Sequence, residues 1–330
     1  KLEDYADRLG AMNVSAVHKN YTGVGTAMVH MEAEPVFWDA LEQDKTPVFG
    51  ACELPAGDVS DRTGWSPAGE DCQIEWLMCF KAGRGGQRAK KCDFGADRTH
   101  ATNVAKAMSS VAPGARIISI KLTSRDGRAY KLAVDWLTTP SSDFSWYESN
   151  NYSAEEAIYY RNYFGGKSPA EFWNVVAING SFHQGGTEVG DVWADDGEVL
   201  GVFSENCAVY NDTEEFRPEK YIVDWWAAHD PRKKQFAAYE GYDTGSALLR
   251  QFGIMPIFLA HNYLWKRSIK GSDGKVKTTK FVTQNGVAFP ACLPEIFAVS
   301  GIVANYGDAN GRNRYIGSNA HPQLTDFVAP

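Results

Sequence analysis

The stretch THATNVAKAMSSVAPGARIISI, residues 99–120, predicts a helix, a turn and a buried strand in succession. His100 opens a run of small residues that suits a helix over residues 101–109, and Pro113-Gly114 marks a turn. The apolar residues at 116–120 run almost continuously instead of alternating, as a parallel strand covered on both faces requires. The stretch therefore predicts a helix-turn-strand unit with a histidine at its helix start.

Apolar runs and helical stretches alternate along the rest of the chain. Ser153, ahead of Glu155 and Glu156, is the expected N-cap of one helix, and Gly253 is the expected end of another. Further strands are expected at 27–31, 175–178, 257–260 and 296–303, and further helices at 154–163 and 244–252. This alternation predicts a doubly wound α/β sheet. The segments at about 36–97 and 185–239 have no clear period and are expected to be insertions in a single domain spanning 1–330.

Charge and hydropathy limit the partners of this chain. Its 330 residues are 44% hydrophobic and carry a formal net charge of -8. An acidic chain is not expected to bind nucleic acid or an anionic membrane surface. No apolar run approaches the roughly 20 residues of a membrane-spanning helix, so no membrane span is expected. The basic cluster Lys81, Arg84, Arg88, Lys90 and Lys91 lies among glycines and is interpreted as a solvated loop.

The cysteines favour an exported protein. Six of them occur without a CxxC pair, so a zinc site is not expected. Four lie between Cys52 and Cys92, where disulfides would order a glycine-rich stretch; buried free thiols of a cytosolic protein are the alternative. Glycosylation-type triplets begin at Asn13, Asn20, Asn151, Asn179 and Asn211. Together these features predict a secreted or extracellular location.

The segment around His100 resembles the histidine region of the subtilisin-like serine proteases, the subtilases. In that family a His-Gly-Thr-x-Val-Ala-Gly helix leads to a Val-Ala-Pro-x-Ala turn; here ATNVAK follows His100, and VAPGA occupies 111–115. The resemblance places His100 on the general base, a role that suits a side chain titrating near neutrality. Ala101 and Lys106 stand where the family has glycines. An ordinary histidine at a helix start is the alternative.

Further segments follow in the family's order. GIMPIFLAHN, 253–262, is similar to the strand that ends in the oxyanion-hole asparagine, which places Asn262 in that role. FPACLP, 289–294, and LTDFVAP, 324–330, resemble the segments that come after it. The resemblance covers nearly the whole chain and implies a three-layer αβα subtilisin-like fold with a mainly parallel central sheet. A strand-end asparagine in a turn is the alternative for Asn262.

The acid of the family is expected at the end of the first strand, in an Asp-Thr-Gly or Asp-Ser-Gly motif. YTGVG, 21–25, resembles the lead-in to this motif, and counting onward places Glu32 at the aspartate position. A glutamate can orient His100, although its extra methylene moves the carboxylate by about 1.5 Å, the length of one C–C bond. A solvated carboxylate at a strand end is the alternative.

The nucleophilic serine of the family is expected beyond Pro330. Gly245-Ser246-Ala247 precedes Asn262 and falls in an expected helix, so Ser246 is interpreted as structural. With the serine, the resemblance implies an endopeptidase that hydrolyses a polypeptide substrate by a Ser/His/acid mechanism. The alternative is an inactive pseudoprotease that binds a protein partner, because glycines are replaced in several motifs.

No cofactor is expected to be required, and no metal ligand is assigned. The resemblance is compatible with a structural calcium ion, and acidic loop residues occur at Asp191, Asp195, Asp196 and Glu198. Gly23-Val24-Gly25 precedes an apolar strand instead of following it, so a dinucleotide-binding loop is not expected.

Overall fold

The chain forms two compact units in the computed structural model. The first comprises Lys1–Phe182 with Arg232–Pro256, and the second comprises His183–Pro231 with Ile257–Pro330. The structure describes residues 14–33, 74–83, 86–89, 99–122, 127–181, 191–193, 199–202, 234–259, 264–270, 276–283, 290–291, 293, 295–301 and 327–329. Each unit is described by itself.

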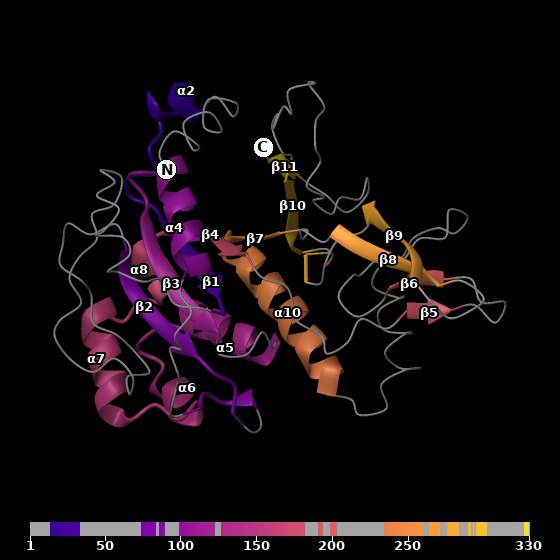
Figure 1. Ribbon diagram of the computed structural model, residues 1–330. Coiled ribbons are helices and arrows are strands. Elements are labelled where there is room, and N and C mark those ends of the chain that lie inside the picture. The colour runs from indigo at the N-terminus through magenta and orange to yellow at the C-terminus, as the bar shows by residue number, and fades with distance from the viewer. Residues whose placement is uncertain are drawn as a thin grey trace. The chain divides into compact units, whose positions relative to one another are not determined.

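Parallel strands form the sheet of the first unit (Figure 1). They are β1 Ala27–Glu32, β2 Ile74–Phe80, β3 Arg116–Leu122 and β4 Val175–Gly180, in the order β4-β1-β3-β2. Ala27 of β1 lies opposite Arg116 of β3, and Met28 lies opposite Ala177 of β4. Parallel neighbours need long crossover connections, and helices occupy these connections here.

The helices of this unit lie mainly between its strands, and α2 precedes β1. They are α2 Val14–His18, α4 Thr99–Val111, α5 Gly127–Thr138, α6 Phe144–Ser149, α7 Ala154–Phe164, α8 Pro169–Trp173 and α10 Lys234–Gln251. The start of α7 is a capping box, in which the Ser153 hydroxyl accepts from the N–H of Glu156 and the Glu156 carboxylate accepts from the N–H of Ser153. Gly165 ends α7 in the left-handed conformation, with φ of 61°.

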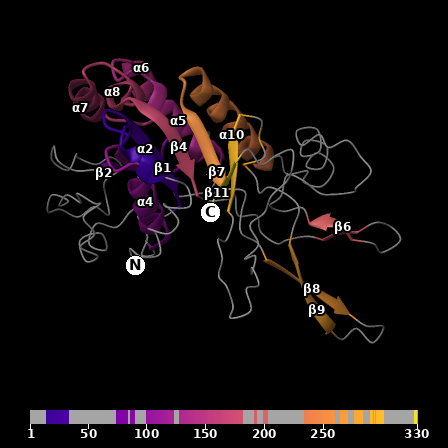
Figure 2. The ribbon, with the colours of Figure 1, turned by 90° about the horizontal axis from the view of Figure 1, so that it is seen from above.

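The two faces of this sheet are covered by different helices. Successive strand residues point to opposite faces, so His30 and Glu32 share one face of β1 and Met31 lies on the other. His30 contacts Ala101 of α4. On the opposite face, the Phe80 ring of β2 lies 5.6 Å from the ring of Trp136 in α5. The sheet is therefore the middle of three layers, with α4 on one side and α5 on the other (Figure 2).

The layer between the sheet and α5 is rich in aromatic side chains. Trp136 is fully buried, and its ring lies 6.2 Å from each of the rings of Phe164 and Trp173 and 6.3 Å from that of Tyr160. Large buried aromatic rings contribute much apolar contact area, so this cluster stabilises the packing of α5, α7 and α8.

Helix α10 packs against α5 at small residues. A Cβ on Gly241 would collide with the backbone carbonyl of Gly127, which shows how closely the two helices approach. The rings of Tyr130 and Tyr242 are 4.8 Å apart, and the Tyr130 hydroxyl lies 3.0 Å from that of Ser246. Ser246 is completely buried in this contact, as its structural interpretation requires.

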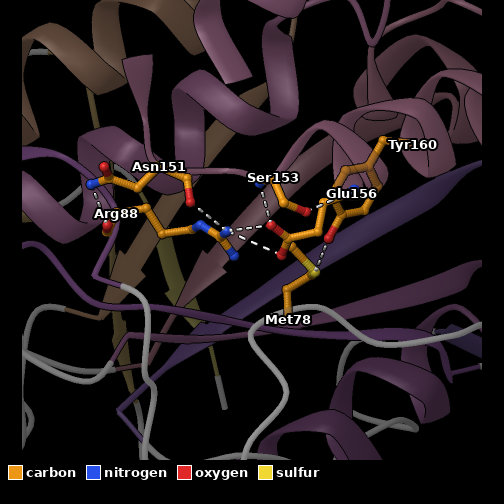
Figure 3. A network of polar contacts seen from close by, with 6 residues as sticks. All are labelled: Met78, Arg88, Asn151, Ser153, Glu156 and Tyr160. Atoms are coloured by element: carbon orange, nitrogen blue, oxygen red, sulfur yellow. Dashed lines mark hydrogen bonds and ion pairs between the residues drawn. The ribbon is translucent and has the colours of Figure 1, made fainter. Parts of the chain in front are cut away.

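Arg88 is buried, whereas the sequence interpretation placed it in a solvated loop. Its Nη2 donates to Oε2 of Glu156 at 3.0 Å and to the carbonyl of Asn151 at 3.1 Å (Figure 3). Its guanidinium lies 3.6 Å from the centroid of the Tyr152 ring. The side chain is 3% exposed, and the hydrogen bonds of Nη2 and the ring face replace part of its hydration, while Nε and Nη1 have no hydrogen-bond partner among the described residues. Arg88 thus connects residues 86–89 to the start of α7 by its side-chain contacts.

The second unit contains short antiparallel pairs and a parallel ladder. β5 Asp191–Trp193 pairs with β6 Val199–Val202, and β8 Leu264–Lys270 pairs with β9 Val276–Thr283, both antiparallel. β10 Phe297–Gly301 pairs in parallel with β11 Phe327–Ala329 and with residues 257–259 of β7 Met255–Leu259.

The predicted α/β class, with a mainly parallel central sheet flanked by helices, is confirmed. The five expected strands correspond to β1, β3, β4, β7 and β10, and the expected helices to α4, α7 and the second half of α10. The start of α10 at Lys234 and strand β2 lie within the two segments expected to be insertions. Most of these two segments lies outside the described residues, so the single-domain organisation stays a prediction.

Two further expectations concern membranes and cysteines. No helix in the described part of the chain is long and apolar enough to cross a membrane. Cys79 in β2 is buried and is not a free thiol. The other five cysteines lie outside the described residues, so their pairing stays a prediction.

Candidate active site

A carboxylate and an imidazole meet where β1 ends and α4 begins. Oε2 of Glu32 lies 2.9 Å from Nδ1 of His100. The Glu32 side chain is 2% exposed, whereas that of His100 is 56% exposed. One partner of the pair is therefore held in the interior, and the other reaches the surface.

The parallel sheet explains why these two residues meet. Glu32 is the last residue of β1, and His100 is the second residue of α4, the helix that leads into the neighbouring strand β3. A helix that connects parallel strands runs back across the sheet, so its start lies at the carboxyl ends of the strands. In open α/β sheets this is the edge at which ligands bind.

The longer side chain of a glutamate does not prevent this contact. Oε1 of Glu32 accepts a hydrogen bond from the backbone N–H of Ala33 at 2.8 Å, which leaves Oε2 toward His100. No described residue makes a well-aligned hydrogen bond to Oε2, although this oxygen lies close to Nδ1 of His100. Catalytic hydrogen bonds often become aligned only when the substrate is bound.

A second histidine lies beneath the pair and was not identified from the sequence. His30 is completely buried, and its Nε2 lies 3.1 Å from the carbonyl oxygen of Ala101 in α4. Burial lowers the pKa of His30 to about 4, although Glu32 nearby acts in the opposite direction. The available signal was its position: a polar residue in an apolar strand, two residues before Glu32 and hence on the same face.

More polar groups line the face of the sheet that α4 covers. Ser119 and Lys121 of β3 lie opposite His30 and Glu32 in the parallel register and are 1% and 6% exposed. The interior faces of parallel sheets are usually apolar. Buried ionisable groups that gather at the end of a sheet are candidates for a functional site.

The pair has the arrangement needed for proton transfer. A carboxylate at Nδ1 holds an imidazole in the tautomer whose Nε2 accepts a proton, and it stabilises the imidazolium that results. The half-exposed ring of His100 is accessible to a reacting group. Among the described residues, no three His, Cys, Asp or Glu side chains are grouped so that they could hold a metal ion.

The other expected site residues fall largely beyond the described ranges. Asn262 lies outside them, so its expected place in an oxyanion hole stays a prediction. Of the acidic loop residues, Asp191 belongs to β5, and Asp195, Asp196 and Glu198 lie outside the described residues. The structure therefore brings together two of the three expected catalytic residues, Glu32 and His100.

Of the comparisons with known proteins, the one with solved structures finds matches. No protein-family model matches the chain, and no curated protein matches it. Among solved structures, 23 chains match. One is a Pseudomonas sedolisin, a serine-carboxyl proteinase, complexed with two molecules of pseudo-iodotyrostatin, with a TM-score of 0.35 and 12% sequence identity. That match covers 89% of this chain and 57% of the sedolisin chain. The chain is thus weakly similar to a structure with a subtilisin-like fold, and these comparisons do not identify its family.

Proposed function

We propose that this chain belongs to a serine endopeptidase that hydrolyses peptide bonds by a Ser/His/acid mechanism. The observation that carries the proposal is the pair of Glu32 and His100, whose oxygen and nitrogen are 2.9 Å apart. Its support is that a buried carboxylate faces Nδ1 of a histidine whose ring remains accessible, which is the relation of the acid to the base in catalytic triads.

In the proposed reaction, the serine expected beyond Pro330 attacks the scissile carbonyl carbon. His100 accepts the serine proton at Nε2 and then gives it to the leaving amine, which departs as the peptide bond breaks. Water attacks the resulting acyl-enzyme, again with His100 as the base, and releases the acid product and the serine. Asn262 donates a hydrogen bond to the oxyanion formed in each step.

The burial of Glu32 determines how strongly it acts on His100. Its side chain is 2% exposed, so little water screens its charge. The effective dielectric constant near such a group is well below that of water, and the carboxylate then stabilises the imidazolium formed during the reaction. Glu32 in this proposal orients the base and compensates its charge, while His100 alone moves protons.

The substrate class follows from the same proposal. A polypeptide is the partner of an endopeptidase, and secretion with disulfide-linked cysteines is the setting proposed for it. The finding that Cys79 is not a free thiol supports such a setting.

The test uses the full natural protein and a fluorophosphonate probe, which labels an activated serine. Intact mass spectrometry should show one adduct. His100→Ala should abolish labelling, and Glu32→Gln should slow it by about a hundredfold or more, because it keeps the shape and removes the charge. Ser246→Ala is the matched control and should label like the natural protein, since Ser246 is buried in α10.

The absence of labelling would contradict the proposal, provided that an active serine protease is labelled under the same conditions. The alternative, a pseudoprotease that binds a protein partner, would then be favoured. Labelling that persists in His100→Ala would also contradict it, because the serine would then be activated by another group.

A further inference from the structure

His30 and Glu32 both reach toward α4 from one face of β1. They are two residues apart, so they project to the same side of the sheet. Glu32 contacts the His100 side chain, with Oε2 and Nδ1 2.9 Å apart. His30 contacts the backbone of the next residue, with Nε2 3.1 Å from the carbonyl oxygen of Ala101. Strand β1 therefore holds the first turn of α4 at two adjacent residues.

The two contacts constrain different features of the helix. The contact with Glu32 ends on a side chain that can rotate about its own bonds. The contact with His30 ends on the backbone, so it limits how the first turn of α4 can move along or around the helix axis. A shift of about 1 Å in a catalytic group can reduce the rate on the order of a hundredfold, so such a constraint has consequences for catalysis.

A histidine is an unusual residue for this position. It is completely buried, and no described residue donates a hydrogen bond to its Nδ1. Leaving a buried acceptor without a partner costs free energy, whereas an apolar residue of similar size would avoid that cost. The hydrogen bond to Ala101 is the interaction that an apolar residue could not replace.

The groups around His30 favour one protonation state of its ring. Among the described residues, the ionisable groups near this face are Glu32 on the same strand, His100 on α4 and Lys121 on β3. Ser119 and Asn179 lie opposite His30 in the neighbouring strands. Burial disfavours the charged imidazolium. The ring is then neutral with its proton on Nε2, because Nε2 must donate to the Ala101 carbonyl.

We propose that His30 is a positioning residue, which holds the first turn of α4 through the Ala101 carbonyl so that His100 stays against Glu32. The catalytic consequence rests on the proposed function; the placement of His100 does not. His30 does not touch the substrate in this proposal, and it acts only through the neutral Nε2–H form.

The experiment compares two substitutions in the full natural protein. His30→Met has a similar volume and no donor, whereas His30→Gln places an amide N–H near the position of Nε2. The His100 ring is followed by NMR, which reports its tautomer and the midpoint of its titration. Peptide hydrolysis supplies kcat and KM. Ser246→Ala, which removes a buried hydroxyl on the other side of the sheet, is the control for general loss of stability.

We expect His30→Met to lower kcat by about tenfold or more while KM changes by less than about twofold. The midpoint of the His100 titration should change in His30→Met. In His30→Gln, kcat and this midpoint should both return toward their values in the natural protein. If His30→Met does not fold, His30→Asn replaces it, because its amide is one bond shorter and does not reach Ala101; it should be impaired where His30→Gln is not.

Two results would overturn the inference. One is an unchanged His100 titration in His30→Met or His30→Asn. The other is equal impairment of the donor-keeping His30→Gln, which would mean that shape alone matters. If the natural protein has no peptidase activity, the proposed function fails, and the NMR comparison still decides whether His30 positions His100.

Discussion

Acid should destabilise the folded protein through His30, and His30→Gln should remove this effect. The pKa of His30 falls from 6.5 to about 4 in the folded state, chiefly because the ring is completely buried. A lowered pKa means that the unfolded chain binds the proton first as the pH falls. His30 therefore contributes stability above about pH 6.5, and this contribution is lost as the pH falls to about 4.

The size of the loss follows from the difference between the two states. The pKa values differ by about 2.5 pH units, and each unit corresponds to about 1.4 kcal/mol, so the loss is about 3 kcal/mol. Glu32 near the ring favours the proton and His100 opposes it, but burial has the largest effect. A glutamine does not titrate, so His30→Gln should lose only the stability that depends on the other titrating groups.

The assay is urea unfolding of both proteins at several values between about pH 7 and about pH 4, the range set by the His30 pKa. We expect the free energy of unfolding of the natural protein to fall by about 3 kcal/mol more than that of His30→Gln over this range. Parallel curves for the two proteins would refute the reasoning, because they would show that His30 binds its proton equally well in both states.

Three further substitutions test other parts of the structure. Arg88→Met should lower the free energy of unfolding by about 2–3 kcal/mol in a urea titration. This is less than the loss expected for a fully buried ion pair, because Glu156 is 33% exposed. An unchanged free energy of unfolding would show that water compensates Glu156 when Arg88 is removed. Ser153→Ala should cost about 1 kcal/mol and speed amide exchange in α7, and unchanged exchange would argue against the cap. Gly241→Ala should lower the stability by about 1–3 kcal/mol in thermal unfolding, because the added Cβ meets the Gly127 carbonyl. A gain in stability, which helix propensity alone would give, would contradict that packing.

The strands of the sheet could be predicted because burial on both faces leaves a continuous apolar run. The runs at 27–31, 116–120 and 175–178 show this pattern and became β1, β3 and β4. Helix α5 was not predicted. Its polar residues Arg128, Lys131 and Asp135 recur at a helical spacing and its other residues are buried, so the sequence did carry a signal for this helix.

The candidate site was predictable in part. The resemblance to a known family indicated Glu32 and His100, because each motif lies in one short segment of the chain; the structure shows their contact, and their catalytic roles stay a proposal. The role of His30 could not be read in this way, since its partner is the backbone carbonyl of Ala101, 71 residues further along the chain. A backbone partner leaves no mark in the sequence.

The sequence by itself determined the elements that depend on neighbouring residues: the apolar strands, the Ser153 cap, the Gly253 helix end and the histidine at the start of α4. Only the tertiary structure decided which distant residues meet. It buried Arg88 of a glycine-rich basic segment against Glu156, and it placed His30 and Glu32 under the first turn of α4. Local patterns reflect backbone preference and burial, whereas these contacts depend on how the crossover connections bring remote segments together.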